Sequence, residues 1–473
     1  MSKIQFFLIM LTFLGLSFSA KAQVNESTAK TVGQNFLKSK GVNSELKLAH
    51  STAEYFVFNG ENGFVIVSAS NNVTPILGYS TEGSFDVTNL SPAAKEILDG
   101  YSKEIAYVIS KQIEVKQVQV QWENLSNGIA PKVQKANSVA PLLGEMKWGQ
   151  GDVTTNGLWY NDSCPEDANG KRAVAGCNAT MMAMIIKYYN TKLQITGEHK
   201  YSATYSGQQY GELYANFGGT AYNWNLMPDV LSASSSSAEV SAVAQLIYHC
   251  GVSVNMKYGP TVSTSRGFID NVYKNQSDGT NTYMCVRFAL EDFWGFDEVA
   301  QIERKDFSYN DWISAIKEEL DKGHPINYGS SNHSYICDGY DSENRLHLNF
   351  GWAGYGNGYF CVSDTSVIKA AGNNLTNGQY AMINLKSKNQ TGIAAVKPTA
   401  SVKVYPNPTN GQLRIMNYEL REDAVIEIYD VLGQKLQSKI VNLQSKIVID
   451  ISPLASGIYF LKVDNQVIKF IKE

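Results

Sequence analysis

All six cysteines of this 473-residue chain, and five of its six histidines, fall between Cys164 and Cys361. Six cysteines over this length are too few for a disulfide scaffold. Their concentration instead marks a middle segment, about 136–386, as the part of the chain that carries chemistry. The length of that segment suits one two-lobed α+β domain.

The composition narrows the class of protein. The chain has 40 Lys and Arg residues and 44 Asp and Glu residues, which gives a net charge of −4. Proteins that bind nucleic acid need a concentrated patch of basic residues, and this charge balance argues against one. Hydrophobic residues make up 44% and charged residues 18%, which supports packed cores rather than a disordered chain. We therefore expect folded domains and no nucleic-acid partner.

Residues 1–22 are predicted to be a signal peptide. Met1–Lys3 is basic, Phe6–Leu16 is largely apolar, and Ala20-Lys21-Ala22 places small residues where signal peptidase reads. A membrane anchor is the alternative, but the apolar run is shorter than the roughly 18 residues that span a bilayer. We expect an exported, soluble protein that starts near Gln23, with no transmembrane segment.

Residues 23–135 form the next predicted unit, a small α+β domain. An amphipathic pattern predicts a helix over 28–40, and Tyr55–Phe58 and Phe64–Val67 flank a hairpin signal. Ser91-Pro92 is an N-cap followed by proline at the first helical position. The polar stretch Glu123–Ala140 is predicted to be a linker.

The C-terminal residues are predicted to form a separate β-sandwich, 402–473, after a polar linker over 387–401. The sandwich contains no Cys, His or Trp, so we expect no catalysis from it. Short alternating segments separated by turn signals predict its strands. These are Val402–Tyr405, Gln412–Ile415, Val425–Tyr429, Ile447–Ile451, Ile458–Val463 and Val467–Ile471.

Cys177 is the candidate nucleophile. Small residues precede it, and Met181–Tyr189 continues as a helix, so the sulfur would lie at a helix N-terminus. The helix dipole and a neighbouring imidazole favour a thiolate there. A buried, inert cysteine is the alternative interpretation.

His333 is the candidate base. It begins an apolar strand, and Asn349 follows sixteen residues later, on what would be the neighbouring strand. Such an amide can orient an imidazole that serves a cysteine, and the Trp352 ring can shield the bond between them. Together these residues favour catalysis by Cys177.

Gln150 is a candidate for stabilising negative charge on a reacting oxygen. It lies 27 residues before Cys177, in a glycine-containing loop, and its amide can donate a hydrogen bond to an oxyanion. A solvated loop glutamine is the alternative.

The remaining reactive residues point to no second site. Neither a Cys-x-x-Cys pair nor a His-Glu-x-x-His motif occurs, so we expect no metal site and no cofactor. Structural or solvated roles are expected for His199, His249, His324 and His347. Cys250, Cys285, Cys337 and Cys361 are expected in the core, and a disulfide from Cys164 to one of them stays open.

From about Pro141 to Leu385 the motifs resemble the streptopain family of papain-like cysteine peptidases. The motifs that carry the resemblance are Trp148-Gly149-Gln150, Cys164-Pro165, Gly176-Cys177-Asn178-Ala179-Thr180, Tyr258-Gly259-Pro260, Asn332-His333 and Asn349-Phe350-Gly351-Trp352. Residues 23–135 resemble the inhibitory prodomain of that family. Residues 402–473, with Tyr405-Pro406-Asn407-Pro408, resemble the C-terminal sorting domain of the type IX secretion system of Bacteroidetes.

The resemblance implies roles for individual residues. Cys177 is the nucleophile, His333 the general base and acid, and Gln150 with the Cys177 backbone N–H the oxyanion hole. Asn332 and the Thr264-Ser265 loop match positions that line the substrate cleft. Phe350 stands where the family often has Trp, and Asn332 where it often has Gly, so the preferred substrate is left open.

We therefore expect an exported cysteine endopeptidase made as a zymogen. The implied partners are protein or peptide substrates, the chain's own prodomain as inhibitor, and the secretion machinery that reads residues 402–473. The product would be secreted or attached to the cell surface after passing through the periplasm of a Gram-negative bacterium. The alternatives are a Cys–His amidase or peptidoglycan hydrolase, and an inactive homologue that binds surfaces.

Overall fold

The structure is a computed structural model of the chain. The predicted signal peptide, residues 1–22, lies outside the residues that it describes. The described residues are 24–129, 138–151, 159–205, 207–267, 284–330, 333–362, 378–388, 403–416, 425–431, 433–440, 447–463 and 466–473.

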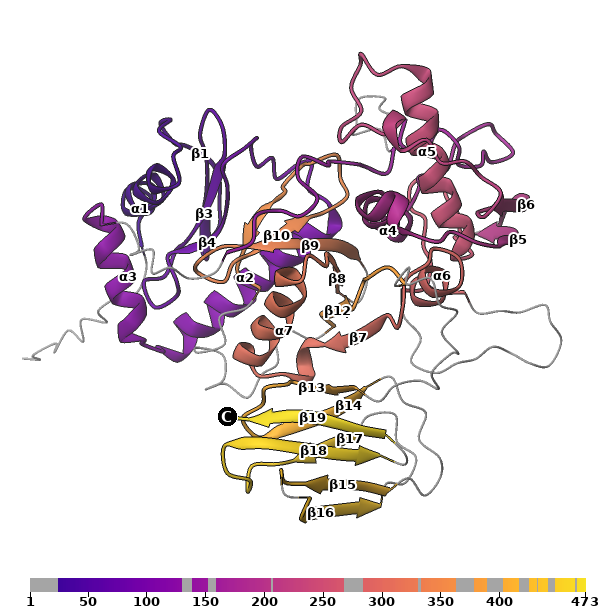
Figure 1. The fold of residues 1–473 in the computed structure, drawn as a ribbon. Helices are drawn as coiled ribbons and strands as arrows, with labels where there is room; N and C mark the ends of the chain where they lie inside the picture. The colour runs from indigo at the N-terminus through magenta and orange to yellow at the C-terminus, as the bar shows by residue number, and fades with distance from the viewer. Residues whose placement is uncertain are drawn as a thin grey trace, which may run out of the picture.

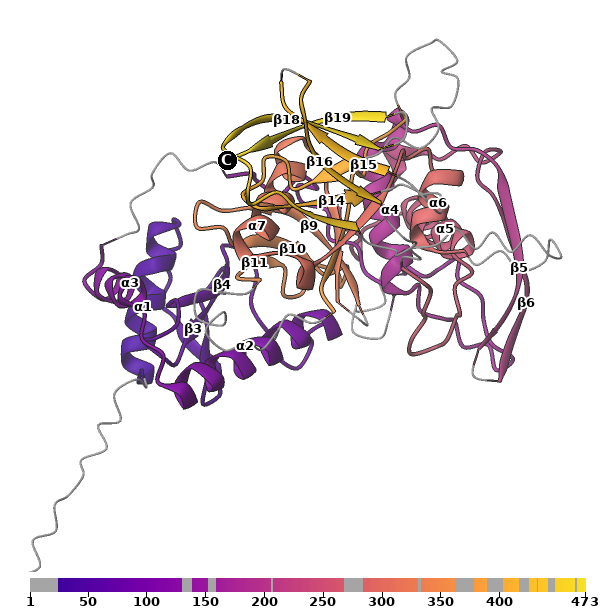
Figure 2. The same ribbon diagram turned by 90° about the horizontal axis from the view of Figure 1, so that it is seen from below.

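The N-terminal unit, residues 24–129, has helices on both faces of a short antiparallel sheet (Figures 1 and 2). Its elements are α1 (Glu26–Ser39), β1 (Lys47–Ser51), β2 (Tyr55–Asn59), β3 (Phe64–Ser68), β4 (Ile76–Ser80), α2 (Pro92–Lys111) and α3 (Lys116–Ser126). The β2–β3 hairpin and the Ser91 cap of α2 confirm two local predictions. The predicted linker start at Glu123 is wrong, because α3 continues to Ser126 and buries Trp122 and Leu125.

The helical lobe, residues 159–295, packs around the buried helix α4. Its elements are α4 (Cys177–Tyr189), η2 (Asn190–Lys192), β5 (Glu198–Tyr205), β6 (Gln208–Asn216), η3 (Trp224–Leu226), α5 (Ser237–Ser253) and α6 (Val286–Asp292). Nearly every side chain of α4 is buried, which explains its run of Met, Ala and Ile. Strands β5 and β6 form a separate ribbon at the outer side of this lobe (Figures 1 and 2).

The sheet lobe, residues 296–388, consists of antiparallel strands with α7 packed against them. Its elements are β7 (Ala300–Glu303), η4 (Arg304–Asp306), α7 (Tyr309–Asp321), β8 (Ile326–Gly329), β9 (Ser334–Tyr340), β10 (Leu346–Asn349), β11 (Gly358–Phe360) and β12 (Tyr380–Ile383). All seven residues of β9 are buried, so this strand lies at the centre of the lobe.

The N-terminal unit and the sheet lobe share one ten-stranded sheet, in the order β1-β2-β3-β4-β11-β10-β9-β8-β12-β7. The junction is the pairing of β4 with β11, where Tyr79 lies opposite Tyr359 and their rings stack 5.1 Å apart. The Cys361 N–H also donates to the Leu77 carbonyl at 2.8 Å. The N-terminal unit is thus bound to the sheet lobe by main-chain hydrogen bonds as well as by side chains.

Arg345 anchors the same junction. Its Nη1 donates to Asp341 of the sheet lobe at 2.9 Å, and its Nε donates to the Ile76 carbonyl of the N-terminal unit at 3.2 Å. The guanidinium also lies 5.1 Å from the centre of the Phe36 ring. Arg345 is buried, so loss of Asp341 would leave an unpaired positive charge inside the junction between the two units.

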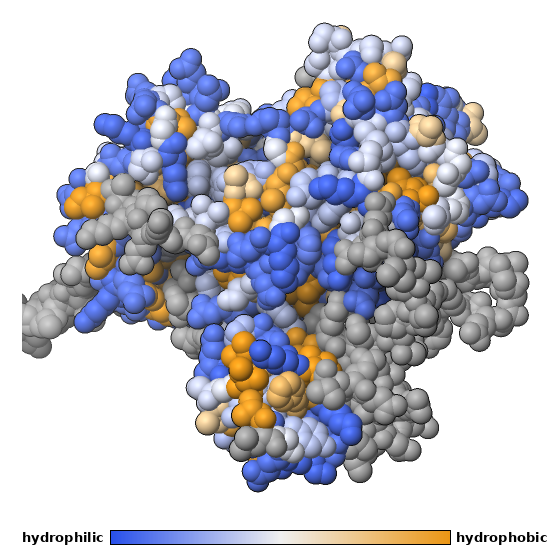
Figure 3. All heavy atoms as spheres, viewed as in Figure 1, coloured by the Kyte–Doolittle hydropathy of each residue, from blue (hydrophilic) through white to orange (hydrophobic). Residues whose placement is uncertain are grey.

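The C-terminal sandwich, residues 403–473, contains a three-stranded sheet, β13-β14-β17, and a four-stranded sheet, β16-β15-β18-β19. Apolar side chains gather on its surface in Figure 3, and its exposed large apolar residues are Val431, Leu436, Ile458 and Ile471. The strands are β13 (Lys403–Tyr405), β14 (Gln412–Met416), β15 (Val425–Tyr429), β16 (Lys435–Ile440), β17 (Ile447–Asp450), β18 (Gly457–Val463) and β19 (Gln466–Lys472).

The sandwich contacts the sheet lobe through a small aromatic and ionic cluster. The rings of Tyr405 and Phe307 lie 5.3 Å apart, and Arg414 lies 3.4 Å from the carboxylate of Asp306. The Tyr405 hydroxyl donates to the Asp311 carbonyl at 3.3 Å. These contacts hold the sandwich below α7, where Figure 1 shows it.

The predicted fold class is confirmed: an α+β, papain-like domain of two lobes, preceded by a small α+β unit and followed by an all-β sandwich. Strand β16 was not among the predicted strands. Cys164 forms no disulfide in the structure, so the open possibility of a disulfide from it is not realised. In the part of the chain that the structure describes, no helix has the length and apolar character needed to cross a membrane.

Candidate active site

Cys177 and His333 line one pocket of about 390 Å³ between the two lobes. Cys177 is the first residue of α4 in the helical lobe, and His333 directly precedes β9 in the sheet lobe. The backbone N–H of Ser334 is hydrogen-bonded to the Cys177 sulfur, which places the sulfur against the residue that follows His333. Two side chains 156 positions apart in the chain therefore share one cavity.

Gly176 shapes the turn that presents Cys177. Its φ of +88° is unfavourable for any residue with a side chain. A Cβ atom there would also lie 3.0 Å from the Met256 side chain and 3.1 Å from the Ser263 carbonyl. Glycine thus lets the chain turn sharply into α4 with the sulfur at the start of the helix.

Burial raises the pKa of the Cys177 thiol above its ordinary value. Hydrogen bonds from the backbone N–H groups of Ser334, Asn178 and Cys177 itself act in the opposite direction, but they do not outweigh burial. This differs from the sequence-based expectation that the helix N-terminus favours the thiolate.

Burial also lowers the pKa of His333, and the carboxylate of Glu96 partly opposes that shift. The imidazole is therefore biased toward its neutral form. Burial therefore disfavours charge on both Cys177 and His333, and it opposes the formation of a thiolate–imidazolium pair.

Four other predicted site residues line the same pocket: Gln150, Thr264, Ser265 and Trp352. The Gln150 carbonyl accepts a hydrogen bond from the Ala175 N–H at 3.0 Å, which ties the Gln150 loop to the approach to Cys177. The Trp352 indole N–H is buried with no partner among the described residues. The predicted cleft residue Asn332 lies outside the described residues.

Asn349 does not orient His333 in this structure. Its Nδ2 donates to the Met146 carbonyl at 2.7 Å, and its Oδ1 accepts from the Gly351 N–H at 3.1 Å. Among the described residues, neither polar atom of the Asn349 amide is hydrogen-bonded to His333. The expected contact is wrong because the buried amide is used to join β10 to the segment that leads to Gln150.

The N-terminal unit reaches this pocket through helix α2. Pro92, the first residue of α2, lines the pocket together with Cys177. One helical turn later, the Glu96 carboxylate accepts a hydrogen bond from the Ser330 hydroxyl at 2.6 Å. The beginning of α2 therefore occupies one rim of the pocket that contains Cys177 and His333.

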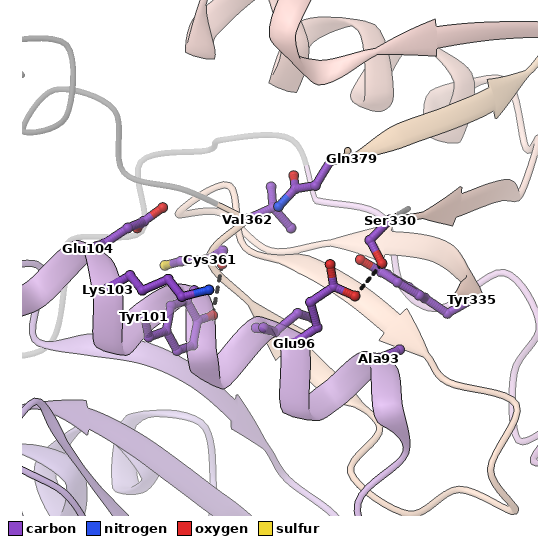
Figure 4. A pocket seen from close by; sticks show the side chains of 12 residues that line it. Ala93, Glu96, Tyr101, Lys103, Glu104, Ser330, Tyr335, Cys361, Val362 and Gln379 are labelled. Carbon is purple, nitrogen blue, oxygen red and sulfur yellow. Dashed lines mark hydrogen bonds between the residues drawn. The ribbon is translucent and has the colours of Figure 1, made fainter. Parts of the chain in front are cut away.

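A second, smaller pocket of about 140 Å³ lies between α2 and the sheet lobe (Figure 4). Ser330 lines both pockets, so the two are neighbours. The Tyr101 hydroxyl lies between the N-terminal unit and the sheet lobe, at 2.8 Å from the Leu77 carbonyl of the first and from the Cys361 carbonyl of the second. This second pocket belongs to the contact between α2 and the sheet lobe.

The other histidines have partners that support their expected structural roles. His347 Nδ1 lies 2.6 Å from the buried Asp338 carboxylate, which also accepts from the Leu143 N–H. His249 Nδ1 lies 2.7 Å from the Tyr222 hydroxyl, and His324 Nδ1 lies 3.1 Å from the Glu319 carboxylate. His199 Nε2 lies 2.6 Å from the Asn255 amide oxygen.

Several pocket residues were not predicted from the sequence. Gln301 on β7 and Tyr380 on β12 line the pocket, and the Tyr380 hydroxyl lies 2.7 Å from the Ser334 hydroxyl. Glu96, which lines the neighbouring smaller pocket, was also missed, because it appears in the sequence as an ordinary polar residue of an amphipathic helix. None of the three stands in a motif, so only the pairing of strands and the docking of α2 bring them to the site.

Comparison with known families finds three matches along the chain. Residues 148–360 match the Peptidase C10 family. Residues 21–105 match the Spi protease inhibitor family, and residues 403–473 match the secretion system C-terminal sorting domain. The pocket that holds Cys177 and His333 lies within the first of these matches, except for Pro92 and Tyr380.

Curated proteins with similar sequences are peptidases. The thiol protease/hemagglutinin PrtT of Porphyromonas gingivalis is 27% identical over 381 residues, 76% of this chain but 41% of that protein. Streptopain of Streptococcus pyogenes is 28% identical over 361 residues, 73% of this chain and 82% of that protein. The chain thus spans less than half of PrtT and most of streptopain.

Among solved structures, a fragment of Prevotella intermedia prointerpain A in a mutant form has a similar fold. The TM-score is 0.56 at 25% sequence identity, covering 73% of this chain and all of that fragment. The similarity supports the arrangement of an N-terminal unit and two lobes described above.

Proposed function

Since residues 148–360 belong to the peptidase C10 family, we propose that this chain is a secreted cysteine endopeptidase made as a zymogen. The observation that carries the proposal is the shared pocket of Cys177 and His333, one from each lobe. The match of the N-terminal residues to a protease inhibitor family supports the zymogen part of the proposal. The substrates are peptide bonds of proteins.

In the proposed reaction the Cys177 sulfur attacks the carbonyl carbon of the scissile bond. His333 takes the thiol proton and later donates it to the leaving amine. The product of this first stage is a thioester on Cys177, which water then hydrolyses with His333 as general base. No cofactor takes part in this sequence.

The negative charge on the carbonyl oxygen needs donors that are already in place. The Gln150 side-chain amide lines the pocket with Cys177, and its loop is tied to Ala175 by a backbone hydrogen bond. We assign this amide and the Cys177 backbone N–H as the two donors. Positioned donors of this kind stabilise the intermediate because they need no reorganisation during the reaction.

The N-terminal unit acts as the inhibitor in this proposal. The start of α2 occupies a rim of the pocket, and Glu96 binds Ser330, three residues before His333. The same unit adds β1–β4 to the sheet, and its Pro92 lines the pocket of Cys177 and His333. Cleavage after α3, between about Asn127 and Pro141, would detach this unit from the catalytic lobes.

The C-terminal sandwich directs the chain out of the cell in this proposal. Its match to a secretion system sorting domain supports secretion or attachment to the cell surface. The partner is the machinery that reads this domain, after passage through the periplasm. The sandwich lines neither pocket described above, so its role is separate from peptide hydrolysis.

The amidase and the inactive homologue are the competing functions. Purified precursor is incubated under reducing conditions with casein and, separately, with muropeptides. We expect casein hydrolysis that a thiol-directed inhibitor abolishes. We also expect N-terminal sequencing to find a new end after α3, between about Asn127 and Pro141. Muropeptide cleavage without casein cleavage would favour the amidase, and no thiol-dependent hydrolysis of either would favour the inactive homologue.

A further inference from the structure

A loop of the helical lobe, residues 259–265, forms one wall of the pocket that contains Cys177. Five consecutive residues of this loop, 261–265, line the pocket. The loop is narrow, because Lys257 and Thr264 exchange two backbone hydrogen bonds of 2.8 and 3.1 Å across it. We call residues 259–265 the cleft loop, and its position sets the width of the pocket on this side of the sulfur.

The cleft loop is bound to the chain segment that precedes Cys177. The Val174 N–H donates to the Gly259 carbonyl at 3.0 Å, and the Ser263 hydroxyl donates to the Val174 carbonyl at 2.6 Å. The Ser263 hydroxyl also accepts a hydrogen bond from the Gly259 N–H at 3.0 Å. These bonds are buried, and they fix the loop to the residues that lead into α4.

Asn178 binds the same loop from the other side of Cys177. Its Nδ2 donates to the Ser265 hydroxyl at 2.9 Å and lies 3.3 Å from the Ser265 carbonyl. Asn178 is the second residue of α4, and its backbone N–H is hydrogen-bonded to the Cys177 sulfur. One buried residue therefore contacts both the proposed nucleophile and the wall of the pocket.

We propose that Asn178 is a positioning residue that holds the cleft loop in place relative to the Cys177 sulfur. Because the loop is bound on both sides of Cys177, the wall that receives the substrate and the atom that attacks it keep one geometry. A loosened loop would have to be ordered by each substrate that binds, which weakens binding. The inference rests on the proposed peptidase function and adds a residue that the proposed reaction does not use.

The test measures kcat and KM on one peptide, with the enzyme left after self-processing of the full chain. Asn178→Ala and Ser265→Ala each remove the hydrogen bond between these side chains. Each should raise KM about fivefold, the worth of about one neutral hydrogen bond, with little change in kcat. The double variant should be no worse than either single one, because the two residues share one interaction.

Two further variants make the measurement specific. Asn225→Ala removes an exposed asparagine of η3 in the same lobe, and as the matched control it should keep the wild-type KM. Asn178→Asp covers the case in which Asn178→Ala fails to fold. It keeps the size of the side chain and can accept a hydrogen bond from the Ser265 hydroxyl, so its KM should stay near the wild-type value.

Three results would overturn the inference: an unchanged KM in Ser265→Ala, additive losses in the double variant, or a loss confined to kcat. A merely structural role of Asn178 would lower the yield of folded enzyme without this pattern in KM. Hydrolysis that depends on Cys177 would in each case leave the proposed peptidase function standing, whereas no hydrolysis of any peptide by the wild type would contradict both.

Discussion

The Glu96 carboxylate, on a helix of the N-terminal unit, accepts a 2.6 Å hydrogen bond from Ser330, three residues before His333. Glu96 is also the charge that partly offsets the effect of burial on the pKa of His333. One side chain of the proposed inhibitor therefore contacts the loop that carries the proposed general base, and it influences the charge of that base.

The Glu96–Ser330 contact predicts how tightly the precursor is held inactive. A hydrogen bond to a charged group contributes about 1.5–3 kcal/mol, so Glu96→Ala should weaken the docking of α2 by about tenfold or more. In a Cys177→Ala background, where no self-processing occurs, this should appear as faster proteolysis of the linker by added trypsin. Glu61→Ala, on the exposed β2–β3 turn, is the control. Equal cleavage rates for the two variants would contradict the role of Glu96.

Gln150 is predicted to act on the chemical step rather than on binding. Loss of one oxyanion donor typically lowers kcat about 10²–10³-fold. We expect Gln150→Ala in the trimmed enzyme to show this loss with little change in KM, measured with a single peptide substrate. A change in KM alone would show that Gln150 acts in substrate binding and is not the side-chain donor of the oxyanion hole.

Because His249 is buried, we expect the folded chain to lose stability in mild acid. Burial lowers its pKa to about 4 in the folded chain, against about 6.5 when unfolded. As the pH falls through this window the unfolded chain takes up the proton first, so the free energy of unfolding should decrease by about 3 kcal/mol by pH 4. His249→Asn keeps an acceptor for the Tyr222 hydroxyl but cannot titrate.

Urea unfolding at several pH values between 7 and 4 measures this effect. Wild type and His50→Asn, the control, should show the same acid slope, and His249→Asn a shallower one. Equal slopes for all three proteins would show that His249 does not titrate differently in the folded and unfolded states.

The C-terminal sandwich is predicted to be dispensable for hydrolysis and necessary for export. A chain that ends at residue 390 keeps β12 and the hydrogen bond from the Lys388 N–H to the Gly295 carbonyl. It loses the contacts of Tyr405 and Arg414 with the sheet lobe, at some cost in stability. We expect unchanged kcat/KM in vitro and retention in the periplasm of the native host. A normal extracellular yield would refute the sorting role.

The sequence predicts the parts of this molecule that have local signals. Ser91-Pro92 predicts the start of α2, and the alternating segments after residue 402 predict most of the sandwich strands. The small residues before Cys177 and the strand after His333 predict where both side chains lie in their own elements. These features depend on neighbouring residues, so a single sequence contains them.

Contacts between distant segments have no such signal. Asn349 follows His333 at a spacing that suits a supporting amide, yet its hydrogen bonds go to Met146 and Gly351. The pairing of β4 with β11 joins Tyr79 to Tyr359, and nothing in either strand specifies the other. Burial of Cys177 likewise depends on the packing of both lobes around the pocket, so the direction of the thiol pKa shift was not predictable from the helix start alone.

The central claim is that Cys177 and His333 act as one catalytic unit. The most direct measurement is peptide hydrolysis by trimmed enzymes carrying Cys177→Ala, His333→Ala and both substitutions. Because the members of such a unit are not additive, the account predicts that each single variant is about as inactive as the double variant. Appreciable turnover by Cys177→Ala, or a double variant far less active than either single one, would contradict it.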